Sequence, residues 1–164
     1  MRKIFIYQRP ASQRPSSHRV RQKVMQSLHE RPPLQILKSI PGIGDLSAIE
    51  ILVELQDINR FETEDQLAAY LGLTPSQYSS GEHIRMGRIT HGGNSRIRTA
   101  LVESSWILIG RDPAMRKKYE NIKYRRGAKR AIIAVARILS SRIRRILLDQ
   151  VPYKIGLQSF NVSC

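Results

Sequence analysis

Hydrophobic residues recur at helical spacing along most of the chain after residue 33. A first short helix is predicted from three apolar residues on one face, Leu34, Leu37 and Ile40. Pro41, Gly42 and Gly44 then interrupt the pattern, and a second helix is expected to run to about Leu55. The segment therefore predicts a helix-hairpin-helix, in which a tight glycine turn joins two helices.

Four more helices are predicted downstream, three of them from capping residues. Thr63, with Gln66 three residues later, forms a capping box, and Asn94 is a favoured N-cap. Asp112 is expected to cap the next helix, with Pro113 in the first turn. The predicted helices are a short one after Thr63, one from Asn94 through Ile109 that closes at Gly110, one that ends near Gly127, and one from Ala128 to Leu148.

The last predicted helix separates an apolar face from a basic face. Its apolar positions are Ile132, Val135, Leu139, Ile143 and Ile146, and Arg130, Arg137, Arg144 and Arg145 lie opposite. One face should pack while the other is placed to meet phosphates. Trp106, which precedes Ile107 and Leu108 in an earlier predicted helix, is predicted to belong to the core.

Three segments lack a sustained hydrophobic period. Residues 1–33 predict a flexible basic arm with a short helix from Arg21 to Glu30, and residues 151–164 predict a tail. Residues 76–93 predict a long loop, with room for a short extended pair at 83–86 and 88–90. We therefore expect a mostly α fold over residues 34–150, with a helix-hairpin-helix followed by a basic helical lobe.

Charge identifies the expected partner. The 164 residues suffice for one domain, and 28 Lys and Arg against 13 Asp and Glu give a net charge of +15. Residues 111–148 hold 13 basic and two acidic side chains, whereas residues 45–65 hold seven acidic and one basic. This segregation favours nucleic acid as the partner. An anionic membrane is the competitor, but no long apolar run is present, so we expect a soluble, intracellular protein. The single cysteine, Cys164, excludes an internal disulfide and a cysteine-based zinc site.

Two regions are candidates for DNA contact. Gly42 and Gly44 allow close backbone approach, and the start of the second helix could hold a phosphate. The acidic residues that follow, Asp45, Glu50 and Glu54, favour the alternative, a purely structural turn. The second region interleaves Tyr119 and Tyr124 with cations that suit phosphate contact, namely Arg116, Lys117, Lys123, Arg125, Arg126 and Arg130.

A third candidate is chemical. The segment from Gly72 to Arg98 sets two adjacent serines beside a glycine among four arginines, with one acid. An exposed hydroxyl near fixed positive charge is what attack on a phosphodiester requires. The alternative is an ordinary polar turn. His83 and His91 could shuttle protons there, although two isolated histidines are weak evidence, and no spacing resembles a metal site.

Three ordered motifs carry a family resemblance. IPGIG, AAYLGLTPSQYSSG and GRITHGGNSRIRTAL resemble the C-terminal domain of the insertion-sequence-110 transposases, the Piv-like and bridge-RNA-guided serine recombinases, from about Leu34 to Leu148. The resemblance implies DNA transposition with Ser80, the serine directly before glycine, as the nucleophile that joins to DNA. It further implies a homo-oligomer on DNA, a structured guide RNA for guided members, and a cytoplasmic, nucleoid-associated protein of a bacterium or archaeon.

The resemblance also sets expectations for the surrounding residues. We expect Arg85 and Arg88 to stabilise the charged transition state, and Arg96 and Arg98 to position the strand, by proximity in sequence alone. Family members begin with a ribonuclease-H-like domain whose four acidic residues bind magnesium. The 33 residues before the match hold one acid, Glu30, so we expect no cofactor in this chain and magnesium only in that other domain.

Three further interpretations remain open. The chain is a truncated reading frame, a fragment, or a part that works beside a separate catalytic half, and alone it is expected to be inactive. A non-catalytic helix-hairpin-helix module that binds nucleic acid would need only the hairpin and the basic helices. A basic RNA-binding protein is a third possibility, because charge attracts RNA and DNA alike.

Overall fold

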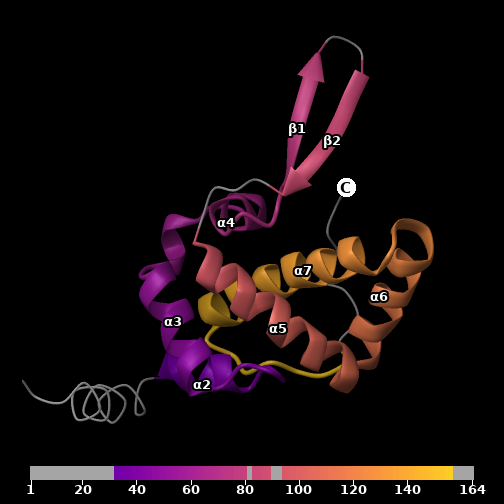
Figure 1. Cartoon of the computed structure of the whole chain (residues 1–164). Helices are drawn as coiled ribbons and strands as arrows, with labels where there is room; N and C mark the ends of the chain where they lie inside the picture. The colour runs from indigo at the N-terminus through magenta and orange to yellow at the C-terminus, as the bar shows by residue number, and fades with distance from the viewer. Residues whose placement is uncertain (1–31, 81–82, 90–93, 157–164) are drawn as a thin grey trace, which may run out of the picture. The chain divides into compact units, whose positions relative to one another are not determined.

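The computed structural model describes residues 32–80, 83–89 and 94–156, and between 75 and 89 it describes the backbone. The predicted arm and its helix at Arg21–Glu30 lie outside these residues. Helices dominate what is described (Figure 1), which confirms the mostly α fold class. The elements are α2 (Pro32–Lys38), α3 (Asp45–Leu55), a 3-10 turn (Ile58–Arg60), α4 (Glu64–Tyr70), β1 (Pro75–Ser80), β2 (His83–Ile89), α5 (Ser95–Arg111), α6 (Pro113–Arg126) and α7 (Ala128–Asp149).

The long helix α7 provides one wall of the core. Its predicted apolar face is buried, including Val135, Leu139 and Ile143, and α7 packs against α5 and α6, as well as against α2 and α4. Figure 1 shows α5, α6 and α7 as neighbours. Burial of apolar surface is the main stabilising contribution to such a helical layer. The amphipathic pattern of the sequence thus predicted both the helix and the face that it buries.

Three predicted N-caps are confirmed. The side chains of Thr63, Asn94 and Asp112 each accept a hydrogen bond from a backbone N–H in the first turn of α4, α5 and α6. The end of α5 differs from the expectation, because Gly110 lies inside the helix, which continues to Arg111. Asp112 is both the C-cap of α5 and the N-cap of α6, so the two helices follow each other without a linker and no glycine ends α5.

The segment expected to be a long loop contains a two-stranded antiparallel hairpin instead. Strand β1 pairs with β2, and the register is interrupted by a bulge between Pro75 and Gln77. The short extended pair expected at 83–86 and 88–90 is wrong in its partners, because residues 83–86 and 88–89 all belong to β2, while Thr90 lies outside the described residues. β2 pairs with the Ser-rich strand β1, whose polar composition gives no clear strand pattern in the sequence.

One further expectation is corrected. Trp106 is 48% exposed and meets Tyr119 edge-on instead of being enclosed in the core. The first part of the predicted tail, up to Gly156, follows α7 and makes specific contacts through Tyr153. In the part of the chain that is described, no helix is long and apolar enough to span a membrane.

Candidate functional site

Ser80 is the last residue of β1, at the end of the hairpin away from its stem. Its backbone pairs with that of His83, whereas Pro75 pairs with Ile89 at the stem. Five strand steps place Ser80 about 17 Å from Pro75. Of the two arginines expected to assist it, Arg85 pairs with Tyr78. Arg88 also lies on β2, so both arginines share the hairpin with Ser80.

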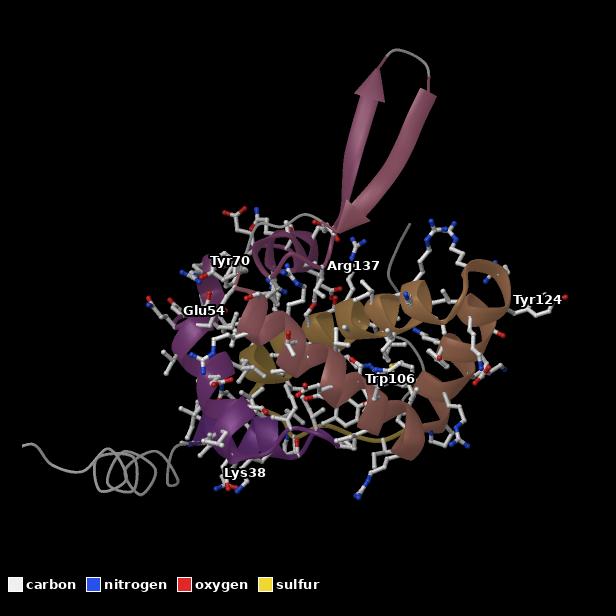
Figure 2. The ribbon with its side chains drawn as sticks, viewed as in Figure 1. Lys38, Glu54, Tyr70, Trp106, Tyr124 and Arg137 are labelled. Carbon is white, nitrogen blue, oxygen red and sulfur yellow. The ribbon has the colours of Figure 1, made fainter. Side chains whose placement is uncertain are left out.

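An acidic residue of α3 binds the two helix ends that flank the hairpin in sequence. Glu54 accepts hydrogen bonds from the Tyr70 hydroxyl (2.8 Å) and from the Asn94 side-chain amide (2.7 Å). Tyr70 ends α4 before the hairpin, and Asn94 caps α5 after it. Figure 2 shows Glu54 and Tyr70 beside each other. Sequence reasoning treated Glu54 only as an acid that disfavours DNA contact. The sequence features that could have indicated this role were an acid on the predicted second helix, Glu54, and the N-cap candidate Asn94.

The other two predicted positioning residues lie in the first turns of α5. Arg96 is exposed and forms an ion pair of 3.3 Å with Glu50 of α3. Arg98 is half-buried in the same helix. The acidic face of α3 is therefore turned toward the start of α5, where it holds Asn94 and Arg96 through neighbouring carboxylates.

The turn between α2 and α3 gives its two glycines different surroundings. Gly42 has φ +94°, and a Cβ there would lie 2.7 Å from the backbone oxygen of Ser104 in α5. The Ser104 hydroxyl also donates a hydrogen bond of 2.9 Å to the Gly42 carbonyl. Gly44 is open, but Asp45 beside it forms an ion pair of 2.6 Å with Lys38. The geometry gives Gly42 a packing role, and DNA contact at either glycine stays a prediction.

The predicted cations of α6 and of the start of α7 are all on the outside of the fold. Arg116, Lys117, Lys123, Arg125, Arg126 and Arg130 are all exposed. We call residues Lys123–Arg130, where α6 ends and α7 begins, the α6–α7 corner; Tyr124 lies on it (Figure 2). Lys123 contacts Glu120 at 3.4 Å, the one acid between Pro113 and Leu148 in the sequence. This surface has the charge that phosphate contact needs.

Other arginines of α7 are engaged within the fold. Arg137 forms an ion pair of 2.7 Å with Asp65 of α4. Arg144 donates to the backbone carbonyls of Phe61 (2.9 Å) and Glu62 (2.7 Å). The basic face predicted for α7 therefore has two uses. Arg137 and Arg144 bind α4 and the segment before it, whereas Arg130 belongs to the α6–α7 corner. Hydrophobic periodicity alone could not distinguish these two uses.

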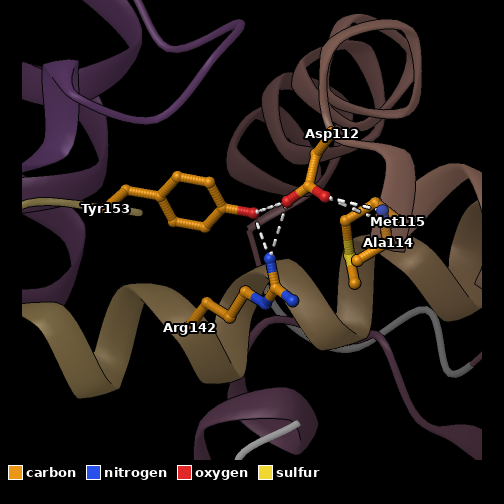
Figure 3. A network of polar contacts seen from close by, with 5 residues as sticks. All are labelled: Asp112, Ala114, Met115, Arg142 and Tyr153. Carbon is orange, nitrogen blue, oxygen red and sulfur yellow. Dashed lines mark hydrogen bonds and ion pairs between the residues drawn. The ribbon is translucent and has the colours of Figure 1, made fainter. Parts of the chain in front are cut away.

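A buried polar network joins three parts of the chain (Figure 3). Asp112 accepts hydrogen bonds from Arg142 of α7 at 3.1 Å and from the Tyr153 hydroxyl. Burial alone would raise the pKa of the Asp112 carboxyl, but the bonds from Tyr153, the Met115 backbone and Arg142 outweigh it and lower the pKa. Burial and the Asp112 carboxylate raise the pKa of Tyr153. The network is structural, because every group in it binds another part of the fold.

The sequence of this helical and hairpin unit matches a described family. Residues 34–120 match the family described as "Transposase IS116/IS110/IS902 family", more than half of the chain. The chain belongs to this transposase family. The match includes α2 through most of α6, and with them the hairpin that carries Ser80.

Individual relatives agree with this transposase assignment. The chain is 32% identical over 126 residues to the transposase for insertion sequence element IS1111A of Coxiella burnetii, covering 74% of the chain and 35% of the relative. It is 32% identical over 128 residues to the 43.6 kDa protein of insertion element IS110 of Streptomyces coelicolor, covering 77% and 32%. The pilin gene-inverting protein of Moraxella bovis is 31% identical over 121 residues, covering 72% and 38%. The chain thus spans about a third of the length of these relatives.

The family resemblance implies magnesium for another domain, and acidic residues in the described part of this chain have other partners. Among the described residues, no group of three or more His, Cys, Asp or Glu side chains is arranged to hold a metal ion. The acidic residues Glu50, Glu54 and Asp112 are each bound to partners within the fold. The described part of this transposase-family chain therefore does not fit a metal site.

Proposed function

We propose that this chain is a DNA-binding transposase domain that supplies Ser80 as the nucleophile for DNA strand cleavage and rejoining. The observation that carries the proposal is the family match across the hairpin, with Ser80 at its far end and two arginines on the same hairpin. A hydroxyl carried on a two-stranded arm can reach a strand held by a separate basic surface.

The proposed reaction is an in-line substitution at phosphorus. The Ser80 Oγ forms a bond to the phosphorus while one phosphorus–oxygen bond of the DNA breaks. The serine gives up its proton to a base, and the departing deoxyribose oxygen gains one. The phosphoserine link keeps the bond energy, so the reverse attack by a deoxyribose hydroxyl rejoins a strand. Arg85 and Arg88 would neutralise the charge that develops on the phosphate oxygens.

The remaining cations would bind the DNA backbone. Arg116, Lys117, Lys123, Arg125, Arg126 and Arg130 supply sequence-independent phosphate contacts, and Arg96 and Arg98 would position the strand near the stem. We further propose a homo-oligomer on DNA at the bacterial or archaeal nucleoid, with a structured guide RNA as a second partner. Magnesium would be held by a separate ribonuclease-H-like domain, and no step above uses a metal held by this chain.

The test is a covalent adduct assay on the full chain, with a ribonuclease-H-like domain of a family member and magnesium added. Labelled DNA flanking the gene that encodes the chain is the substrate. We expect the wild type and Ser79→Ala to form a protein–DNA adduct that survives denaturation, and Ser80→Ala to form none while its DNA affinity is unchanged. The neighbouring serine is the matched control.

Two other outcomes would contradict the proposal. An adduct that persists in Ser80→Ala would assign the nucleophile elsewhere. Tight DNA binding by the wild type with no adduct under any of these conditions would support the alternative, a non-catalytic nucleic-acid-binding module in which Ser80 has no chemical role.

A further inference from the structure

Tyr124 is the most exposed aromatic side chain among the described residues. It lies in the last turn of α6 with 94% of its surface exposed, and Figure 2 shows it pointing away from the helices. Tyr119 of the same helix is 5% exposed and meets Trp106 edge-on, with ring centroids 5.6 Å apart. No aromatic or cation–π contact among the described residues involves Tyr124. The helix therefore uses one tyrosine for packing and leaves the other ring in solvent.

The surroundings of Tyr124 are strongly cationic. Lys123, Arg125 and Arg126 share its helical turn, and Lys129 and Arg130 follow across Gly127. All five are exposed, and Glu120 is the acid nearest in sequence, at 3.4 Å from Lys123. Such a cluster repels itself, and a polyanion relieves that repulsion. An aromatic ring within a cationic groove or ridge is the combination that binds single-stranded nucleic acid.

We propose that the α6–α7 corner binds a single DNA strand and stacks an unpaired base on Tyr124. The inference rests on the proposed function, in which the chain acts on DNA. In a duplex, the face of each base is covered by its neighbours, so an exposed ring can stack only on a base that has left the duplex. Cutting and exchanging strands exposes such bases. The flanking cations hold the phosphates on either side of the stacked nucleotide.

The test compares one sequence as a single strand and as a duplex, by fluorescence anisotropy with the full chain. We expect Tyr124→Ala to weaken single-strand binding roughly tenfold, within the range for loss of one base–aromatic stack. Duplex affinity should stay within about twofold, because the phosphate contacts are unchanged. Tyr124→Phe, the matched control, should keep single-strand affinity. In Tyr124→Trp, the added fluorescence should be quenched by the single strand and not by the duplex.

The possible results separate this inference from the proposed function. If Tyr124→Ala binds both DNA forms as the wild type does, or weakens both equally, the stacking site is overturned and DNA binding stands. If the wild type binds an RNA single strand but not the DNA strand of the same sequence, the assignment to DNA is overturned. If the wild type binds neither form of DNA, the proposed function fails first. The exposure of Tyr124 means that thermal stability should be equal in all variants, which calorimetry verifies.

Discussion

The Asn94 side-chain amide donates a hydrogen bond of 2.7 Å to Glu54 Oε2, across 40 residues of sequence. The other oxygen of the same carboxylate accepts from Tyr70, so Glu54 binds the chain both before and after the hairpin. Asn94 also caps α5 with its own oxygen, at 3.0 Å from the Arg96 nitrogen. The start of α5 and the end of α4 are thereby tied to the acidic face of α3.

Removal of this carboxylate should loosen the helix ends on either side of the hairpin. We expect Glu54→Ala to lower the free energy of unfolding by about 1–2 kcal/mol, because two hydrogen bonds to a half-buried charged group are lost. Thermal unfolding by circular dichroism measures the loss, and hydrogen exchange should become faster at residues 75–89. Glu103→Ala is the control, because Glu103 is exposed on α5. Equal melting temperatures and equal exchange for the two variants would contradict the role of Glu54.

The two glycines of the α2–α3 turn should respond differently to a methyl group. Gly42→Ala is expected to destabilise by at least about 1 kcal/mol, because φ is +94° and the new Cβ would lie 2.7 Å from the Ser104 oxygen. Gly44→Ala should cost only a few tenths of a kcal/mol, since nothing lies within 4 Å of its Cβ position and its φ is −92°. Urea unfolding of the paired variants tests this, and a similar loss for both would refute the packing role of Gly42.

Tyr153 should make the fold sensitive to alkali. Its pKa is raised in the folded state, so its contribution is complete below the ordinary tyrosine value of about 10 and is lost as the pH rises further. We expect the wild type to lose stability above about pH 10 more steeply than Tyr153→Phe. Near neutral pH, Tyr153→Phe should be less stable by about 1 kcal/mol, from the missing hydrogen bond to Asp112. Parallel pH dependence in the two proteins, measured by chemical unfolding, would rule out this coupling.

Salt dependence should distinguish cations that bind DNA from those that hold the fold. Each of Lys123→Ala and Arg126→Ala should reduce the slope of log affinity against log salt by about 1. Arg137→Ala should leave that slope unchanged, because Arg137 is paired with Asp65 at 2.7 Å. Titrations of duplex DNA at several salt concentrations provide the measurement. If Arg137→Ala lowered the slope and the other two variants left it unchanged, Arg137 would be the DNA contact, and Lys123 and Arg126 would not.

Features that depend on neighbouring residues in the sequence were predictable. The caps at Thr63, Asn94 and Asp112 follow from local hydrogen bonding, and the buried face of α7 follows from spacing alone. The hairpin was not predictable in this way, because strand pairing depends on a partner and β1 is rich in polar residues.

The candidate site shows the same division. Ser80 was identified from a sequence motif, but its place at the far end of the hairpin required the strand register. The tasks of Glu54 and Arg144 depend on contacts with residues 40 and 82 or more positions away, which no local pattern encodes. Trp106 looked like a core residue because its neighbours are apolar, yet the packing of α6 leaves half of it exposed.

The contact between the segment after α7 and the turn after α2 has a consequence for biosynthesis. The Tyr153 backbone nitrogen donates to the Ser39 hydroxyl at 2.7 Å, across 114 residues, and its phenol completes the shell around Asp112. During translation, the ribosome delivers Tyr153 only after every helix of the unit has been made. Until Tyr153 has emerged from the ribosome, the buried Asp112 carboxylate at the junction of α5 and α6 therefore lacks its hydrogen bond from the Tyr153 hydroxyl, and Arg142 lacks its bond to the same hydroxyl.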